Sequence, residues 1–304
     1  MVRPKLVLGT AQLGMRYGIA NRIGKPKLEI AHEILTVAYQ NDIVIWDTSP
    51  AYGDSETIIG KYLKASQERP KISSKLPSIT ANDKHRSISP SLTDFVNKSI
   101  TGSLLSLDVD MIDYYFIHDE RDFCNLGLDL VNVLHSFKKR GILDKIGISV
   151  YSPEIALEAL RTRQFDIIQL PYSLFDRRFL EAISLANALG VMVFVRSIFL
   201  QGLFFLSDRQ AQRVLPEAVH AIEKLNTLSQ QYECSIARMA LCFVRDTPGV
   251  SAILVGVESP SQLLQNLAWF SSTELSENLR REIEVSFQDL PVHILNPSIW
   301  RTKK

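Results

Sequence analysis

Four residues of different chemical types, Asp47, Tyr52, Lys75 and His118, stand at or just after the ends of short apolar runs. These runs are, in chain order, Ile43–Asp47, Lys71–Lys75 and Met111–His118. Tyr52 lies in the turn that follows the first of them. If the runs are successive parallel strands, the four side chains meet at one rim of a barrel, where catalytic groups collect.

A phenol, an ammonium, a carboxylate and an imidazole at one rim suit the reduction of a carbonyl group. This reaction delivers a hydride to carbon and a proton to oxygen. Tyr52 could donate the proton at neutral pH if the ammonium of Lys75 lowers its pKa from the ordinary value of about 10. Asp47 would keep that ammonium charged and in place. His118 would hydrogen-bond the carbonyl oxygen and orient the substrate.

Each residue alone also has a structural explanation. A strand-end Lys or His is usually incidental, and Asp47 could instead cap the turn after its strand. The run His118-Asp119-Glu120 is compatible with a metal site, as in barrel hydrolases, but no His-x-His closes the first strand. The joint occurrence of the four residues favours catalysis, and we predict that no metal is bound.

The overall composition excludes several classes of partner. The 304 residues include 34 basic and 33 acidic side chains and carry a formal charge of +1, which gives no electrostatic basis for binding nucleic acid or an anionic membrane. The three cysteines have neither metal-ligand nor redox spacing, as expected in a reducing cytoplasm. The apolar runs are too short to span a bilayer, and the first residues do not resemble a secretory signal. We therefore predict a cytoplasmic protein that acts on small molecules.

Apolar runs alternate with amphipathic segments along the whole chain. We expect strands at Lys5–Gly9, Ile43–Asp47, Lys71–Lys75, Met111–His118, Lys145–Ser149, Asp166–Leu170, Val191–Val195 and Ala252–Val255. We expect helices at Lys27–Gln40, Ser55–Leu63, Ser91–Leu105, Leu126–Arg140, Pro153–Leu160, Arg177–Leu189, Leu215–Gln231, Ser235–Arg245, Pro260–Leu267 and Glu277–Phe287.

This alternation predicts an α/β fold in which a parallel sheet is covered by helices. Eight strands favour a closed (β/α)8 TIM barrel, and the absence of Gly-x-Gly-x-x-Gly after the first strand argues against a Rossmann domain. Without a linker, repeat or low-complexity tract, we predict a single domain over residues 1–304. The polar stretch Ser78–Pro90 is expected to be a longer loop over the rim.

Several motifs, taken in order, are similar to those of the aldo-keto reductase family. The segment from Asp47 to Glu56, Asp-Thr-Ser-Pro-Ala-Tyr-Gly-Asp-Ser-Glu, resembles the family signature. Weaker similarities continue at Ser74-Lys75, Asp113–His118, Lys145–Ser149, Ile168–Tyr172 and Gly256–Asn266. The resemblance implies a (β/α)8 barrel that binds a nicotinamide cofactor at its C-terminal rim. It also implies that Tyr52 is the proton donor, Lys75 and Asp47 its tuning pair, and His118 the substrate-orienting residue.

The resemblance further implies which residues contact the cofactor. They are Ser149, Gln169, Arg196, Ser197, Gly256, Gln262 and Asn266. Gln169 could equally be a buried amide that satisfies neighbouring polar groups. Val150 stands where the family has an asparagine, and Arg196 stands where an aromatic ring usually stacks on the nicotinamide; its planar guanidinium can also stack.

The adenosine end departs from the family pattern as well. Many members place Lys or Arg where this chain has Gly256, Glu258 and Gln262, which favours NAD(H) or dual use. Family habit favours NADP(H), and NADP(H) is our expectation. Phe199 is expected to line the substrate pocket.

Three functions remain open from the sequence. The first is an NAD(P)H-dependent oxidoreductase that reduces a small or sugar-like aldehyde or ketone. The second is a nucleotide-binding regulatory module of low turnover, and the third is a redox-neutral sugar epimerase with a bound cofactor. The substrate's identity, the physiological direction and the oligomeric state are not readable from the sequence.

Overall fold

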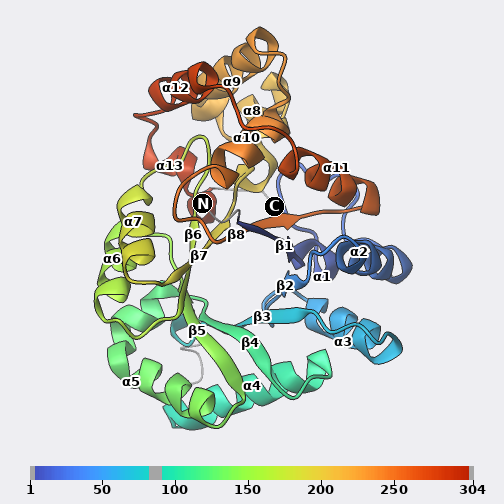
Figure 1. The fold of residues 1–304 in the computed structure, drawn as a ribbon, viewed down its shortest axis with the longest axis vertical. Coiled ribbons are helices and arrows are strands. Elements are labelled where there is room, and N and C mark those ends of the chain that lie inside the picture. The colour runs from blue at the N-terminus through green and yellow to red at the C-terminus, as the bar shows by residue number, and fades with distance from the viewer. Residues whose placement is uncertain (1–3, 82–90, 301–304) are drawn as a thin grey trace.

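Eight parallel strands form a closed barrel in a computed structural model that describes residues 4–81 and 91–300 (Figure 1). Each strand pairs with its sequence neighbours, and β8 closes the ring against β1. The strands are β1 (Lys5–Gly9), β2 (Ile45–Asp47), β3 (Lys71–Leu76), β4 (Ile112–Ile117), β5 (Leu143–Ser149), β6 (Ile167–Pro171), β7 (Met192–Arg196) and β8 (Ala252–Gly256). The predicted (β/α)8 TIM barrel is therefore confirmed.

Helices surround the barrel and connect its strands. In the first half they are α1 (Ala11–Gly14), α2 (Leu28–Gln40), α3 (Ser55–Ala65), α4 (Leu92–Leu107), α5 (Glu120–Lys139) and α6 (Pro153–Arg161). In the second half they are α7 (Leu180–Ala188), α8 (Asp208–Val214), α9 (Val219–Gln231), α10 (Ile236–Arg245), α11 (Pro260–Phe270), α12 (Glu277–Ser286) and α13 (Val292–Leu295). Short 3-10 turns cover Leu200–Phe205, Pro216–Ala218 and Pro297–Ile299.

Most predicted elements agree with the structure to within a few residues, but four helical features differ. Helix α5 begins at Glu120 rather than Leu126, and a non-helical residue, Gly127, with a φ of 51°, interrupts it. This polar first turn lacks the apolar period that the prediction used. Helices α1, α8 and α13 were not predicted, because four, seven and four residues are too short to show a helical period. Of the expected loop at 78–90, residues 82–90 lie outside the described part.

Capping residues and glycine fix the ends of two helices. The hydroxyl of Ser152 accepts a hydrogen bond from the backbone N–H of Ile155 at the start of α6, and Pro153 occupies the first turn. Gly141 follows the end of α5 with a φ of 74°, a left-handed conformation in which glycine has no Cβ penalty.

The two-residue period of the strands separates two apolar clusters. On β1, Val7 points into the barrel, whereas Leu6 and Leu8 pack outward against helices. The inner cluster consists of Val7, Ile45, Tyr114, Phe116, Ile167, Phe194, Ala252 and Leu254. Side chains therefore fill the barrel as a core, and polar groups inside the ring lie at its two ends, with Lys71 over the Tyr114 ring at the amino end of β3 and the candidate catalytic residues at the carboxyl ends of the strands.

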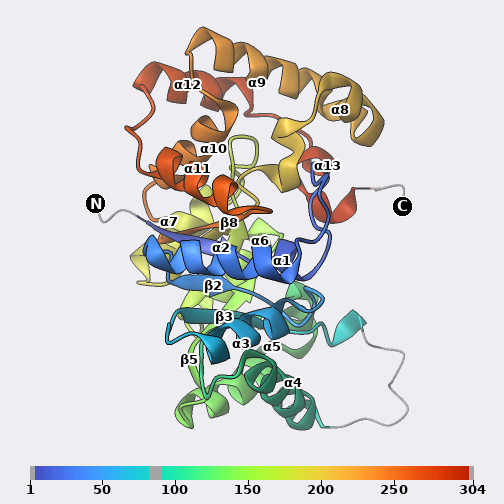
Figure 2. The ribbon, with the colours of Figure 1, turned by 90° about the vertical axis from the view of Figure 1, so that its right-hand side faces the viewer.

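Helices α8, α9 and α12 lie together at one end of the molecule, beyond α10 (Figures 1 and 2). Helix α11 lies next to β8 and packs against α10 and α2. Within the described residues, no helix has the length and apolar character needed to cross a bilayer.

Candidate active site

Strand register places the predicted catalytic residues on the inner face of the barrel. Asp47 pairs with Ser73, and Lys75 pairs with Phe116, whose ring belongs to the inner cluster. Residues opposite each other in a ladder point to the same face, so Asp47 and Lys75 also point inward. His118 continues β4 two residues beyond Phe116. The alternation that fills the barrel with apolar side chains thus brings polar ones together at its upper rim.

Asp47 contacts three other side chains of this polar group. Its Oδ2 lies 2.6 Å from Nζ of Lys75, and its Oδ1 accepts hydrogen bonds from Oγ of Ser73 at 2.7 Å and Nε2 of Gln169 at 3.0 Å. Nζ of Lys75 also donates to the carbonyl oxygen of Thr48 at 2.8 Å. The carboxylate is therefore an internal ion-pair partner and does not cap the following turn.

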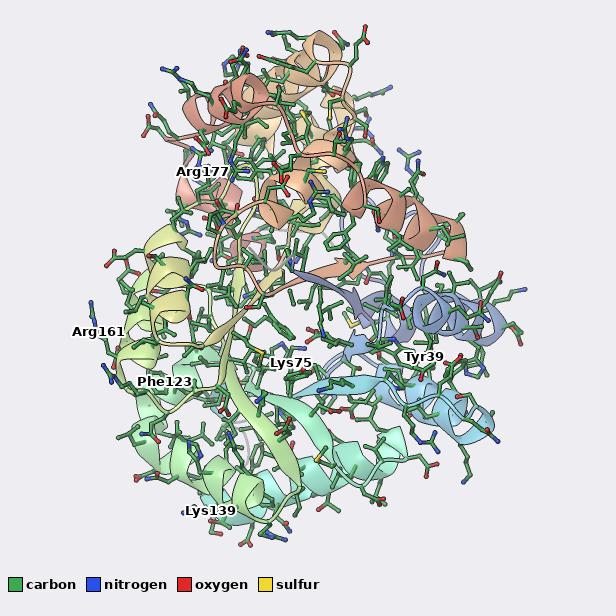
Figure 3. All side chains as sticks on the ribbon, viewed as in Figure 1. Tyr39, Lys75, Phe123, Lys139, Arg161 and Arg177 are labelled. Atoms are coloured by element: carbon green, nitrogen blue, oxygen red, sulfur yellow. The ribbon has the colours of Figure 1, made fainter. Side chains whose placement is uncertain are left out.

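Tyr52 lies next to both Lys75 and His118. Nζ of Lys75 is 5.0 Å from the centroid of the Tyr52 ring, and the Tyr52 and His118 centroids are 5.8 Å apart with the rings nearly perpendicular. Figure 3 shows Lys75 inside the ring of strands, whereas Lys139 and Arg161 lie on outer helices. The structure therefore brings together all four residues that the sequence singled out.

A close backbone contact fixes the turn that carries Tyr52. A Cβ on Gly14 would lie 1.8 Å from the carbonyl oxygen of Tyr52, and a Cβ on Gly53 would lie 2.4 Å from the carbonyl oxygen of Gly14. Beneath this contact, the hydroxyls of Thr10 and Ser55 lie 2.7 Å apart and are fully buried. Only glycine allows α1 and the turn to approach this closely.

The surroundings of the site shift the pKa of its ionisable groups. Burial, followed by the negative charge of Asp47, raises the pKa of Tyr52, and Arg196 acts in the opposite direction. Burial lowers the pKa of the Lys75 ammonium, while Asp47 opposes that change. Burial, with Lys75 and Arg196, lowers the pKa of His118 to about 3. The pKa of Tyr52 therefore moves in the direction opposite to our expectation, because desolvation outweighs the nearby cation.

A cavity of about 430 Å³ extends from Tyr52 and Asp47 to α11. Its volume is within the range of small-molecule and cofactor sites. Near Tyr52 it is lined by Tyr17, Gln169, Arg196, Ser197, Phe199 and Gln201, and toward α11 by Gln12, Gly256, Glu258, Gln262, Asn266 and Trp269. Phe199 lines it as expected; Phe205 lines it too, while Phe204 is buried.

Arg196 makes contacts that the sequence did not reveal. Its guanidinium lies 3.9 Å from the centroid of the Tyr151 ring, and its Nη2 donates to the carbonyl oxygen of Val150 at 2.8 Å. A flat cation is therefore held by the residues that follow β5, where the sequence departs from the family pattern. Ser197 follows it with a φ of 61° and also lines the cavity.

The other predicted cofactor residues are placed differently from one another. Gln169 is buried and its amide donates to Asp47, as the buried-amide interpretation predicts; it also lines the cavity, and its cofactor contact stays a prediction. Ser149 is buried opposite Gln169 in the register and does not belong to the described cavity lining, and its cofactor contact stays a prediction. Asn266 lines the cavity from α11.

The loop after β8 is closed by its own side chains. Oε1 of Gln262 accepts the backbone N–H of Glu258 at 2.7 Å, and the hydroxyl of Ser259 accepts the N–H of Gln262. The amide of Gln12 fills the space beside Gly256, where a Cβ would lie 2.3 Å from Oε1 of Gln12. Gly256 thus admits the Gln12 side chain to the cavity wall.

Sequence reasoning missed several residues of the site. Gln12 of α1, Tyr17 of the loop after α1 and Gln201 of the 3-10 turn after β7 line the cavity, and Nε2 of Gln201 donates to the Tyr17 hydroxyl at 3.3 Å. Ser73 carried one usable signal, because it lies two residues before Lys75 and therefore on the same face of its strand. The sequence carried no such signal for Gln12, Tyr17 or Gln201.

The acids beside His118 have structural partners. Asp119 pairs with Arg121, and Glu120 accepts the backbone N–H groups of Tyr151 and Ser152 at 2.7 and 3.1 Å. Among residues 4–81 and 91–300, no group of three or more His, Cys, Asp or Glu side chains is arranged to hold a metal ion.

Comparison with known proteins gives a consistent family assignment. The model of the aldo/keto reductase family matches residues 5–285. The chain is 26% identical over 271 residues to an NADH-specific methylglyoxal reductase of Escherichia coli K12, covering 79% of this chain and 82% of the relative. It is 25% identical over 312 residues to a pyridoxal 4-dehydrogenase of Microbacterium luteolum, covering 88% and 90%.

A solved structure shares the fold. The chain superposes on the holo form of the aldo-keto reductase AKR11C1 of Bacillus halodurans with a TM-score of 0.73. The match has 21% identity and covers 99% of this chain and 95% of the other. The similarity supports the same barrel architecture.

Proposed function

Because the chain belongs to the aldo/keto reductase family and is an oxidoreductase that acts on carbonyl compounds, we propose that it reduces an aldehyde or ketone with Tyr52 as proton donor. The observation that carries this proposal is the position of Tyr52, which lies at the end of a cavity and beside Lys75 and His118. A proton donor, a cation and an imidazole there can act on one oxygen atom.

The raised pKa of Tyr52 is compatible with a role as proton donor, because a donor must be protonated before the reaction. The phenol keeps its proton at neutral pH and releases it only when negative charge develops on the substrate oxygen. Arg196, which opposes the rise of the Tyr52 pKa, and the ammonium of Lys75, 5.0 Å from the ring centroid, then stabilise the phenolate, because opposite charges interact strongly in a desolvated site. Asp47 holds Lys75 in position, and neutral His118 donates a hydrogen bond to the same oxygen.

The cavity suits an extended nicotinamide cofactor, which supplies the hydride when it is bound. Gln169, Arg196 and Ser197 lie at the Tyr52 end and would hold the nicotinamide part. Gly256, Gln262 and Asn266 lie at the α11 end and would hold the adenosine part. The side-chain amides along this wall offer both donors and acceptors to such a ligand.

For the cofactor, we propose a preference for NADH, whereas our expectation from the habit of the family was NADP(H). At the α11 end, Glu258 is the charged side chain of the described lining, and the one cation of that lining, Arg196, belongs to the Tyr52 end. A 2′-phosphate would bring negative charge toward a carboxylate without a bidentate or point-charge partner. One relative, the methylglyoxal reductase, is NADH-specific by name, which supports this choice.

For the substrate, we propose a small polar carbonyl compound. The wall near Tyr52 combines the aromatic rings of Tyr17 and Phe199 with the polar groups of Arg196 and Gln201. Rings and hydrogen-bonding groups together suit an oxygen-rich, sugar-like or dicarbonyl substrate better than a long hydrocarbon chain. Methylglyoxal and pyridoxal, named for two relatives, are the first compounds to test.

The test is NADH oxidation by the wild-type protein and by Tyr52→Phe with a panel of aldehydes, ketones and sugars. We expect the variant to bind NADH normally and to turn over roughly 10²–10⁴-fold more slowly, as is usual when a general acid is lost. Equal turnover in the two proteins would reject the role of Tyr52. Conversion of a sugar without net NADH oxidation would identify an epimerase, and bound cofactor without any turnover would identify a regulatory module.

A further inference from the structure

Ser49 contacts the imidazole of His118 at its Nδ1 atom. The serine follows β2 by two residues and is fully buried. Its Oγ lies 3.4 Å from Nδ1 of His118. The same Oγ accepts the backbone N–H of Ala51 at 3.1 Å. The hydroxyl thus joins the turn that carries Tyr52 to the histidine that we place on the substrate oxygen.

We infer that Ser49 is a positioning residue, which donates its hydroxyl proton to Nδ1 of His118 and so keeps the imidazole proton on Nε2. The inference rests on the proposed carbonyl reduction. Oγ accepts one hydrogen bond, from Ala51, and Nδ1 of His118 is the acceptor that the described residues offer to its O–H. A neutral imidazole has one proton, so an acceptor at Nδ1 makes Nε2 the donor.

The protonation state of His118 supports this assignment. Burial and the charges of Lys75 and Arg196 lower the pKa of His118 to about 3, so the ring is neutral at physiological pH. A neutral ring exists as two tautomers of similar free energy. Even a long hydrogen bond can therefore shift the population toward one tautomer, because the free-energy difference between the two tautomers is small.

The choice of tautomer decides what His118 can do for a carbonyl substrate. With the proton on Nε2, the ring donates a hydrogen bond to the developing oxyanion. With the proton on Nδ1, the lone pair of Nε2 would face that oxygen and repel it. Ser49 therefore acts on the substrate through His118, without touching it.

The direct test measures the tautomer in the resting protein. Long-range ¹H–¹⁵N correlation spectra of ¹⁵N-histidine-labelled protein distinguish a protonated from an unprotonated ring nitrogen, and a His118→Gln variant assigns the signals. In the wild type we expect His118 to be protonated on Nε2. In Ser49→Ala we expect a mixture of the two tautomers, and in Ser49→Thr we expect the Nε2-protonated tautomer to predominate again. A wild-type ring protonated on Nδ1, or an unchanged spectrum in Ser49→Ala, would overturn the inference.

A kinetic measurement adds a second readout. Ser49→Ala should lower kcat for carbonyl reduction roughly 3–10-fold, the effect of one weak hydrogen bond, and leave the Kd for NADH unchanged. Ser99→Ala is the matched control, since it removes a part-buried serine hydroxyl 3.2 Å from the Tyr115 hydroxyl, away from His118. An equal loss of kcat in the control would reject the inference. Failure of the wild type to reduce any carbonyl would instead reject the proposed function, and the spectra would still decide the tautomer.

Discussion

Lys75 and Asp47 form an ion pair whose Nζ–Oδ2 distance is 2.6 Å and whose side chains are 0% and 3% exposed. Both side chains are almost completely removed from the protein surface. Each charge is therefore tolerated in the barrel because the other is present. The pair also joins β2 to β3 below Tyr52, so its loss should affect both stability and catalysis.

Removal of one partner of this pair should be more harmful than removal of both charges. Lys75→Met leaves Asp47 buried without its cation and should lower the free energy of unfolding by about 3–5 kcal/mol. The double variant Asp47→Asn/Lys75→Met should lose less than Lys75→Met alone, and so less than the sum of the two single losses. Urea unfolding of the four proteins measures this coupling, and strictly additive losses would contradict a coupled pair.

Gly14 should be intolerant of a single added methyl group. In Gly14→Ala the new Cβ must displace the backbone at Tyr52, which should cost about 1–3 kcal/mol of stability and lower turnover more than the affinity for NADH. Gly102→Ala is the matched control, because Gly102 lies on the exposed side of α4 and a Cβ added there would have no atom within 4 Å. The control should gain about 0.5–1 kcal/mol. Thermal unfolding and kcat of both variants provide the comparison.

His118 should make the protein less stable as the pH falls below neutrality. Its pKa is about 3 when folded against an ordinary value of 6.5, so the unfolded chain binds a proton in this window and the folded chain does not. The unfolding free energy contributed by this site is complete above pH 6.5 and declines as the pH falls toward 3. Between about pH 7 and 5, wild type should lose about 1 kcal/mol more than His118→Gln, a figure that allows for partial solvent exposure. Identical pH profiles in urea unfolding would contradict a neutral His118.

Glu258 should control the choice between NADH and NADPH. Glu258→Arg replaces a repelling carboxylate with a guanidinium that can bind a phosphate at two points. The ratio of NADPH to NADH affinity should rise roughly tenfold or more, which corresponds to about 1.4 kcal/mol. Fluorescence titration with both cofactors measures it, and Glu277→Arg, at an exposed position of α12, is the control. If both variants shift the ratio equally, the effect is one of net charge and Glu258 is not the determinant.

The barrel and the polar group at its rim could be predicted because both follow from short-range patterns. Asp47, Lys75 and His118 each stand at the end of a predicted strand, and the two-residue period of strands turns that position into an inward direction. The start of α5 could not be predicted, since its first turn, from Glu120, is polar and is broken at Gly127. The single domain over residues 1–304 and the cytoplasmic location stay predictions.

The rest of the site depends on contacts between distant loops. Tyr17 and Gln201 are 184 residues apart and meet because the loop after α1 and the segment after β7 share one rim. The raised pKa of Tyr52 likewise depends on how completely the folded protein excludes water from it. Neither the depth of burial nor the path of a loop is encoded by residue type at one position.

Because β8 pairs with β1, every strand of the described ring has a neighbour on both sides. The sheet therefore presents no row of unsatisfied backbone groups on which a second chain could extend it. Sequence change in the rim loops can then alter which molecules are accepted while the scaffold keeps its resistance to fibril-like association.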